Sequence, residues 1–492
     1  LGSAALWGLA RVAALEQPEA WGGLIDLDPS PQSDEASVVL AALQADAADD
    51  QTAHRGRSRL VPRLTRIEDR AESVAPLCRS DGAYLVTGGL GGLGLRLSEW
   101  LSERGARHLV LVGRSGSRGA RTPRDTETRA KVLRGLESRG VSVSVVSLDV
   151  SDVEGVRELF QRFGGDLPPL RGIVHAAGVL GSAPVATLGM DGLRAASRAK
   201  VAGGAVLDQL SRSHALDFFL LFSSGASVWG SRGLGAYAAA NHFMDALAHD
   251  RQAQGLPALS VNWGWVEGGG METPEVADFF RRIGLSPMPT PSAFAALEQA
   301  LASGRAQEAV AAVDWSVFRP IYEARRRPSL LEEIRVGAAS DGVVEEAPSV
   351  VSLAHELTPL ALDTRRQRVE DHVGGEVART LGMKSSADVD PGTGFFRMGM
   401  DSILAVQLRD RLRKSLGCVL PATVAFEYPT VAALSDFLVQ TLWPDEEGTV
   451  ESSRDPRGRH QPRSDPVAPS VHQNLSEEEL AARLAAKLRR EA

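Results

Sequence analysis

The chain has 492 residues, 43% hydrophobic and 24% charged, which is an ordinary soluble composition and enough length for about three domains. Its net charge is −8, because 62 acidic residues outnumber 54 basic ones, and this balance argues against nucleic acid as the main partner. The two cysteines exclude a disulfide scaffold and a cysteine-rich zinc site, and we predict no metal. No apolar run is long enough to cross a membrane and no signal peptide opens the chain, so we expect a cytoplasmic protein.

Residues 1–75 are predicted to mix helices and strands. Apolar residues at helical spacing predict helices over 4–16 and 34–48, and a short apolar run predicts a strand over 22–27. A hairpin is expected over 51–64. These elements are too few to close a full α/β layer, and the chain begins with leucine, so we expect a piece of a longer protein.

Residues 76–330 show a different pattern, in which short β-branched runs alternate with helical segments. This alternation predicts a parallel sheet with right-handed crossovers, as in doubly wound nucleotide-binding folds. Seven strands are predicted, over 83–87, 108–113, 141–148, 172–175, 217–222, 259–263 and 309–313.

The pattern stops after the predicted sheet. Glycine, alanine, serine and proline predict a linker over 331–362, and a compact helical domain is expected over 363–442. Few apolar residues predict disorder over 443–473. A capping box then predicts a helix over 474–492 with a leucine stripe, which we expect to bind a second copy, the next polypeptide or the next domain; a solvated tail is the alternative.

A glycine-rich turn follows the first predicted strand directly and leads into a predicted helix. Glycines let the backbone approach a pyrophosphate, and the helix N-terminus adds N–H donors. The cofactor-binding residues predicted here are Thr87, Gly88, Gly89, Leu90, Gly91, Gly92, Leu93 and Gly94.

The ends of the later strands indicate which dinucleotide binds. Arg114, followed by Ser115, offers a guanidinium to a ribose 2′-phosphate where an acid would select NAD, so NADPH is favoured; a solvated arginine is the alternative. Asp149 and Val150 are placed to meet the adenine, although Asp149 also fits a simple loop acid. Small residues after the fourth strand leave room for the nicotinamide half: Ala176, Ala177 and Gly178.

Three polar residues follow the fifth predicted strand. Ser224 lies at the end of that strand, just beyond residue 222, Tyr237 comes 13 residues later at the start of a predicted helix, and Asn241 is four residues beyond Tyr237. A tyrosine beside a hydroxyl and a cation can protonate a carbonyl oxygen that receives a hydride, while the serine holds that oxygen. The cation is expected to lower the phenol pKa from its usual value of about 10.

These features together resemble the ketoreductase of a modular type I polyketide synthase, a member of the short-chain dehydrogenase/reductase superfamily. The resemblance covers residues 80 to about 328, and segment 197–203 is similar to the family's lysine segment. It implies that Tyr237 donates the proton, Ser224 holds the substrate carbonyl and Lys200 supplies the cation for the tyrosine and the cofactor ribose. Asn241 is then the fourth member of the catalytic set. The alternative is that Lys200 lies on a helix surface and that Tyr237 only packs in the core.

The resemblance also implies a reaction, the NADPH-dependent reduction of a carrier-bound β-ketoacyl thioester to a β-hydroxyacyl thioester. The Leu-Asp-Asp motif of B-type members is missing after His175. Trp229, eight residues before Tyr237, is typical of A-type members that give an L-hydroxyl, unless it is a packing aromatic. Leu234 stands where epimerising A-type members have histidine, which argues against epimerisation.

Two further segments resemble parts of the same synthases. Residues 4–65 are similar to the latter half of the ketoreductase structural subdomain, whose first half is absent. Residues 399–402 resemble the attachment motif of acyl carrier proteins, which implies 4′-phosphopantetheine on Ser402; a plain helix cap is the alternative. Residues 363–442 hold ten basic and ten acidic residues, and the helix after Ser402 is basic, so partner recognition cannot rest on bulk charge.

The resemblance implies partners as well. They are the carrier-bound substrate, the ketosynthase, acyltransferase or dehydratase domains of the same synthase, and a homodimeric assembly. Two alternatives remain open at this point. One is a reductase and carrier from a fatty-acid-like or hybrid peptide–polyketide megasynthase, and the other is an inactive reductase that serves as a scaffold for the carrier.

Overall fold

The computed structural model describes residues 1–30, 35–44, 49–67, 77–114, 116, 123–269, 274–323, 329–335, 353–383, 385–395, 397–400, 402–418, 420–421 and 424–444. They form two compact units, one from 1–24, 64–318 and 330–336, the other from 25–63, 319–329 and the residues after 336. None of the described helices is long and apolar enough to cross a membrane. The predicted C-terminal helix and nearly all of the predicted disordered segment lie outside the described residues.

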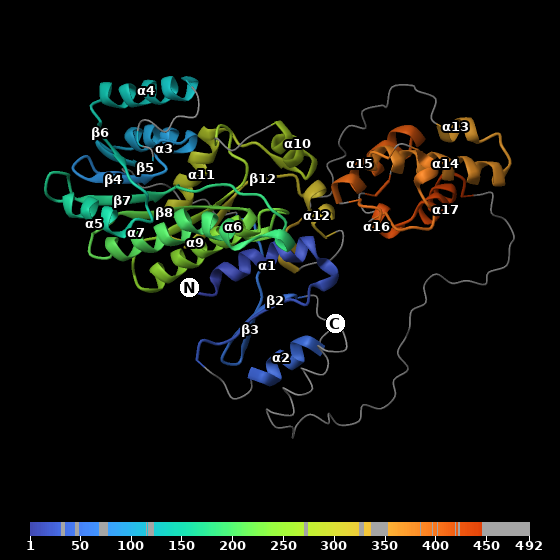
Figure 1. Cartoon of the computed structure of the whole chain (residues 1–492), viewed down its shortest axis with the longest axis horizontal. Coiled ribbons are helices and arrows are strands. Elements are labelled where there is room, and N and C mark those ends of the chain that lie inside the picture. The colour runs from blue at the N-terminus through green and yellow to red at the C-terminus, as the bar shows by residue number, and fades with distance from the viewer. Residues whose placement is uncertain are drawn as a thin grey trace. The chain divides into compact units, whose positions relative to one another are not determined.

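The first unit is built on a seven-stranded parallel sheet, which confirms the predicted fold class (Figure 1). The strand order is β11-β9-β8-β7-β4-β5-β6, so the order reverses between β4 and β7, where doubly wound folds bind their ligands. The strands are β4 (Ala83–Thr87), β5 (His108–Gly113), β6 (Ser142–Ser147), β7 (Leu170–His175), β8 (Phe218–Ser224), β9 (Leu259–Trp263) and β11 (Gln307–Val310).

Helices cover both faces of this sheet (Figure 1). One apolar core joins the sheet to α3 (Gly92–Glu103), α4 (Pro123–Ser138) and α11 (Thr290–Ala302). A second core joins the opposite face to α5 (Val153–Arg162), α7 (Gly203–Ser211) and α9 (Gly235–Ala253). The central strands β4 and β8 are buried almost throughout, which explains why they read as continuous apolar runs.

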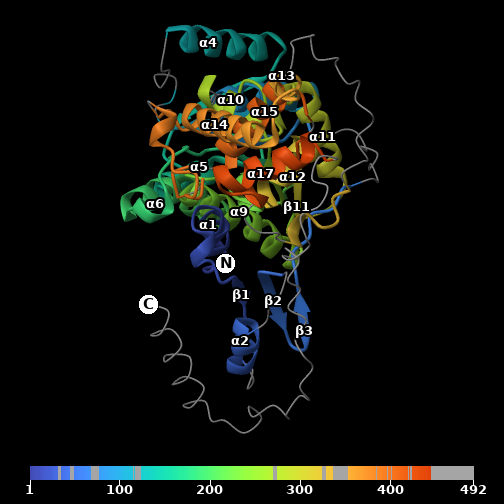
Figure 2. The ribbon, with the colours of Figure 1, turned by 90° about the vertical axis from the view of Figure 1, so that its right-hand side faces the viewer.

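An N-terminal helix, α1 (Ala4–Glu16), lies against α9 on the outer side of this layer (Figures 1 and 2). The approach is close, because a Cβ on Gly8 would lie 2.2 Å from the carbonyl oxygen of Ala238. A glycine is therefore required where the two helices touch. The predicted helix over 4–16 is confirmed.

The last predicted strand, over 309–313, is wrong in its second half, because the chain leaves the sheet after Val310 and forms a separate antiparallel pair.

Short elements connect the main helices and strands of the first unit. The short elements are η1 (Pro18–Ala20), η3 (Val185–Thr187), α6 (Met190–Ser197), the π-helical η4 (Arg198–Ala202), α8 (Ala226–Trp229), α10 (Pro274–Arg282), β10 (Leu285–Ser286), β12 (Ala312–Val313), α12 (Trp315–Glu323) and η5 (Ser329–Leu331).

A three-stranded sheet with order β1-β2-β3 accounts for the rest of the N-terminal region. Its strands β2 and β3 pair antiparallel and form the predicted hairpin. The elements are β1 (Leu24–Asp26), α2 (Glu35–Gln44), β2 (Gln51–Arg55) and β3 (Ser58–Leu60).

The C-terminal region forms a helical domain with its own apolar core. Val369, Val373 and Val377 repeat every four residues on one helix and are fully buried against Leu408 and Leu412 of another. The elements are α13 (Leu353–Leu357), α14 (Leu362–Leu381), η6 (Ser386–Asp388), α15 (Ser402–Leu416), α16 (Val424–Glu427) and α17 (Val431–Leu442). Helix α13 falls within the stretch 331–362 that was predicted to be linker.

Candidate active site and carrier serine

The glycine-rich turn joins β4 to the N-terminus of α3, as predicted. Gly88 has a φ of +70°, and a Cβ at this position would lie 2.9 Å from the backbone of Ala176 after β7. A Cβ on Gly94 would lie 2.3 Å from the carbonyl oxygen of Gly88. Helix α3 begins after Gly91 without a side-chain cap. The turn is therefore a backbone-lined cradle with helix N–H groups beside it, which fits a pyrophosphate.

The predicted dinucleotide-selecting residues lie at the ends of β5 and β6. Arg114 is exposed directly after β5, and Ser115 lies outside the described residues. Asp149 accepts hydrogen bonds from the Ser151 backbone N–H at 3.0 Å and hydroxyl at 2.7 Å. Partial burial raises the pKa of Asp149, but these hydrogen bonds and the charges of Arg198 and Arg114 bring it below its ordinary value. The Asp149 carboxylate is thus held in place and charged.

Small residues after β7 leave room beside the catalytic elements. A Cβ on Gly178 would lie 2.6 Å from the Lys200 side chain, and a Cβ on Gly203 would lie 2.5 Å from Val150. Thr87 Oγ1 lies 2.7 Å from Nδ1 of the buried His175. Burial lowers the pKa of His175 to about 3, so this imidazole is neutral.

The structure brings the four predicted catalytic residues together from three segments. Ser224 ends β8, Tyr237 lies in the first turn of α9 and is 8% exposed, and Lys200 lies on η4 and is 4% exposed. Lys200 Nζ is 5.6 Å from the centre of the Tyr237 ring and donates a hydrogen bond of 2.7 Å to the Phe222 carbonyl. Lys200 is therefore not a surface lysine.

Asn241 is one turn beyond the tyrosine on the same helix. Its Nδ2 donates to the Tyr237 carbonyl at 2.7 Å. Its Oδ1 is buried and accepts no hydrogen bond from any residue that the structure describes. A buried amide oxygen next to the tyrosine is thus available to a further donor.

The electrostatics differ from the expectation in one respect. Burial raises the pKa of the Tyr237 phenol, and the nearby side chains of Ser224 and Asn241 offset only part of that rise. The predicted lowering of this pKa by a cation is therefore wrong for the chain by itself. Burial also lowers the pKa of Lys200 to about 7, against the opposing charge of Asp245. Desolvation outweighs the attraction between these groups.

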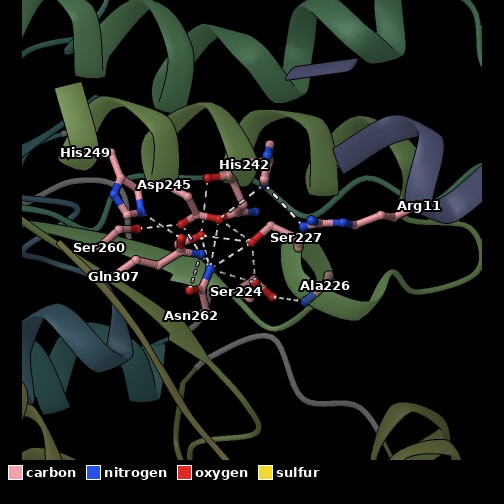
Figure 3. Close-up of polar contacts among 12 residues, drawn as sticks. Arg11, Ser224, Ala226, Ser227, His242, Asp245, His249, Ser260, Asn262 and Gln307 are labelled. Atoms are coloured by element: carbon pink, nitrogen blue, oxygen red, sulfur yellow. Dashed lines mark hydrogen bonds and ion pairs between the residues drawn. The ribbon is translucent and has the colours of Figure 1, made fainter. Parts of the chain in front are cut away.

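A buried polar network that the sequence analysis missed joins α9 to α8 and to the strands β8 and β9 (Figure 3). Asp245, which is 1% exposed, accepts hydrogen bonds from the hydroxyls of Ser227 and Ser260 at 2.6 Å each. Asn262 Nδ2 lies 2.9 Å from each carboxylate oxygen and 3.0 Å from the Ser223 hydroxyl. The network fixes the turn after β8, because the Ser227 hydroxyl lies 2.8 Å from the Ser224 carbonyl.

One signal in the sequence pointed to this network. Tyr237, Asn241 and Asp245 are spaced four residues apart and share one face of a helix that is otherwise rich in alanine. The other members on β8 and β9, Ser223, Ser260 and Asn262, showed no comparable pattern. They come into contact only because these two strands are neighbours in the sheet.

Arg11 of α1 enters the same region from the N-terminal segment (Figure 3). Its guanidinium donates to the Ser227 carbonyl and lies 3.4 Å from His242 Nδ1. Burial, followed by the charge of Arg11, lowers the pKa of His242 to about 4, so the imidazole is neutral at pH 7 and its Nδ1 can accept a hydrogen bond from Arg11. Helix α1 is therefore bonded to the layer that carries the catalytic residues.

Trp229, predicted to influence stereochemistry, ends α8 and is buried. Its ring packs edge to face on Phe318, with centres 5.6 Å apart. A Cβ on Gly225 would lie 2.2 Å from the indole, so the ring fills its space closely. This close packing fits the alternative that Trp229 is a packing aromatic, and its role in stereochemistry stays a prediction.

The predicted attachment serine, Ser402, is the first residue of α15. The serine therefore stands at a helix start, as expected, while Asp401 lies outside the described residues. Helix α15 packs through Leu408 and Leu412, and Arg411 approaches the buried Glu376 at 3.7 Å.

A doubly wound sheet with a glycine cradle and a Ser-Tyr-Lys-Asn set defines a nicotinamide-dependent reductase. Comparison with known families agrees: residues 82–268 match the KR domain, residues 371–438 the phosphopantetheine attachment site, and residues 1–64 the Rossmann fold domain of the polyketide synthase extender module SpnB.

Individual relatives point the same way. Erythronolide synthase EryA3 of Saccharopolyspora erythraea is 39% identical over 89% of this chain, and the pikromycin synthase component PikAIII of Streptomyces venezuelae is 37% identical over 88%. The chain spans 13% and 28% of these two proteins.

A solved structure of A-type ketoreductases from a modular polyketide synthase is 39% identical, with a TM-score of 0.63 over 68% of this chain and 69% of that one. The ketoreductase from the first module of phoslactomycin biosynthesis in Streptomyces sp. HK803 is 37% identical, with a TM-score of 0.62 over 68% and 76%. The chain belongs to the ketoreductases of modular polyketide synthases, joined here to a carrier domain.

Proposed function

We propose that the chain reduces a β-ketoacyl thioester, tethered to the carrier domain, to a β-hydroxyacyl thioester with NADPH. The observation that carries the proposal is the buried Tyr237, with Ser224 and Asn241 beside its phenol and Lys200 Nζ 5.6 Å from its ring. The reaction adds a hydride to the ketone carbon and a proton to its oxygen.

The residues of the chain supply the proton. Since burial raises the pKa of Tyr237, the phenol keeps its proton at neutral pH and can donate it to the carbonyl oxygen. Ser224 Oγ is placed to donate a hydrogen bond to the same oxygen, where negative charge develops. Lys200 supplies positive charge as the phenolate forms, and the free Oδ1 of Asn241 can hold a donor that returns a proton.

The glycine cradle fits a dinucleotide, because side chains at Gly88 or Gly94 would collide with backbone. When bound, the reduced nicotinamide supplies the hydride. Arg114 and the charged Asp149 lie at the strand ends predicted to hold the adenosine half, and an exposed guanidinium favours a 2′-phosphate. These residues support NADPH over NADH.

The stereochemical part of the proposal is an A-type reduction to the L-hydroxyl. The position of Trp229, eight residues before Tyr237, and the absence of a Leu-Asp-Asp motif after His175 support it. The likeness to a structure described as A-type is consistent with this choice.

The carrier part of the proposal is esterification of Ser402 by 4′-phosphopantetheine. The thiol of that arm would hold the acyl chain as a thioester. Tethering raises the effective concentration of the substrate, so weak contact with the reductase is enough for turnover. Other domains of the longer synthase, in a homodimeric assembly, would supply the ketoacyl chain and take up the product.

Reduction of a β-ketoacyl thioester by the full chain tests the enzyme. We expect faster oxidation of NADPH than of NADH, an L-configured product, and a loss of about 10²- to 10⁴-fold in kcat for Tyr237→Phe. The matched control is Tyr428→Phe, a carrier tyrosine that stacks on Phe437. Undiminished reduction by Tyr237→Phe would overturn the assignment of the proton donor, and a D-configured product would overturn the A-type assignment.

A further inference from the structure

Helix α1 ends on a carboxylate that joins two separate loops. Glu16 Oε2 accepts a hydrogen bond of 2.6 Å from the Val185 backbone N–H, and Oε1 accepts one of 2.7 Å from the Gly233 backbone N–H. Gly233 in turn accepts a hydrogen bond of 2.8 Å from the Ala183 N–H. One side chain thus fixes segment 183–185 to segment 230–234. Charge-assisted bonds of this kind are stronger than neutral ones.

Both loops border the catalytic tyrosine. Segment 230–234 leads directly into α9, and Tyr237 lies in the first turn of that helix. A Cβ on Gly235 would lie 3.0 Å from Val185, so the two loops pack together beside this turn. Tyr237 also shares an apolar cluster with Val12 of α1. A shift of either loop would therefore change the packing around the phenol.

The helix that carries Glu16 is itself held firmly. Gly8 allows α1 to touch the backbone of Ala238, and Arg11 donates to the carbonyl of Ser227. Gly230, with a φ of +80°, leaves room for the end of α1, since a Cβ there would lie 2.9 Å from Leu15. The Glu16 carboxylate is consequently a fixed point to which the loops are attached.

Two apolar side chains that flank segment 183–185 in the sequence face solvent. Leu180 is 41% exposed and Met190 is 61% exposed, one on each side of residues 183–185. Exposed apolar side chains of this size can offer surface to an acyl chain. A shift of segment 183–185 would move the stretch of chain that carries them.

We propose that Glu16 is a positioning residue for the reduction, which holds segments 183–185 and 230–234 in the arrangement that orients the acyl chain toward Tyr237. The inference rests on the proposed β-ketoacyl reduction. It assigns to the N-terminal subdomain a direct part in substrate geometry and stereochemical outcome, carried by one carboxylate.

The experiment uses the full chain with Glu16→Gln. Glutamine keeps one acceptor oxygen, but its NH2 group would face one of the two backbone N–H donors, so one loop is released. We expect kcat/KM for the β-ketoacyl thioester to fall about tenfold and the minor hydroxyl stereoisomer to increase, while KM for NADPH stays unchanged. Amide hydrogen exchange should become faster in 183–188 and 230–234, and not in α5.

A second variant breaks the same contact from the loop. Val185→Pro removes the donor N–H at the first position of η3, where proline is tolerated and where the preceding Pro184 already has extended backbone. We expect the same direction of change in the product ratio. The matched control is Glu19→Gln, an exposed acid on η1 close by in sequence, which should behave like wild type.

The outcomes separate the two proposals. If wild type is active, and both Glu16→Gln and Val185→Pro keep its product ratio and its kcat/KM for the β-ketoacyl thioester, the inference alone is overturned. A parallel rise in KM for NADPH would overturn it too, since that indicates general loosening of the reductase. An inactive wild type would overturn the proposed function and with it the role of Glu16 in reduction.

Discussion

The reductase and the carrier place their functional groups in opposite ways. In the reductase, Ser224, Tyr237 and Lys200 come from β8, α9 and η4, and burial shifts the pKa values of both Tyr237 and Lys200. In the carrier, the candidate group is one serine at the start of α15, on a scaffold whose interior is apolar. The first site depends on tertiary assembly of polar groups, and the second on a single local position.

This contrast has a consequence for substitutions. Residues outside the candidate catalytic set, such as Asp245 on the same helix as Tyr237 and Arg11 on α1, belong to the buried polar network beside the reductase site. In the carrier, we expect chemistry to respond only to the serine as long as the helical core remains packed. The two kinds of site can be distinguished experimentally.

The largest expected effect is at the carrier serine. Ser402→Ala removes the only hydroxyl that we propose for attachment, so incubation with a phosphopantetheinyl transferase and coenzyme A should give no gain in intact mass. The matched control is Ser386→Ala, an exposed serine on η6, which should give the full gain. A full gain for Ser402→Ala would show that the site does not depend on this local position.

The next effect concerns the polar layer of the reductase. Asp245→Ala leaves the buried donors of Ser227, Ser260 and Asn262 without their acceptor, so we expect a loss of about 3 kcal/mol in the free energy of unfolding. Urea unfolding followed by tryptophan fluorescence measures the reductase, because only Trp443 of the eight tryptophans lies in the carrier domain. Asp191→Ala, at a fully exposed carboxylate, should change stability by less than about 0.5 kcal/mol.

The smallest effect is a pH dependence. Burial lowers the pKa of His242 to about 4, whereas the unfolded chain titrates near 6.5, so the unfolded state binds the extra proton between these values. Stability is therefore lost as pH falls from about 6.5 to 4, at about 1.4 kcal/mol per pH unit for this one group.

His242→Gln should remove that contribution and flatten the acid side of the stability curve, measured by urea unfolding at pH 7 and pH 5. The control is His355→Gln, on helix α13. In this variant the unfolding free energy of the reductase should depend on pH as it does in wild type. Parallel curves for wild type and His242→Gln would contradict the assignment.

The sequence predicted those features that depend on local order along the chain. Alternation of apolar runs and helical segments predicted the seven-stranded parallel sheet, and the strand–glycine–helix order placed the cradle at Gly88 and Gly94 correctly. The prediction of the last strand was wrong beyond Val310. Residues 312–313 pair instead with β10, and a pairing with a separate segment is not visible in the local sequence.

The sequence by itself therefore indicated the fold class and the cradle, which are marked by the order of elements, and Ser224, Tyr237 and Asn241, which are marked by spacing. Lys200 and the carrier serine Ser402 were indicated by family resemblance. Tertiary structure alone decided that Lys200 is buried, that the Tyr237 pKa is raised rather than lowered, that Asn262 bonds to Asp245, and that Glu16 joins two loops. These properties depend on desolvation and on contacts between separate segments, such as Glu16 with Gly233, which lie 217 residues apart, so they cannot be read from the spacing within one segment.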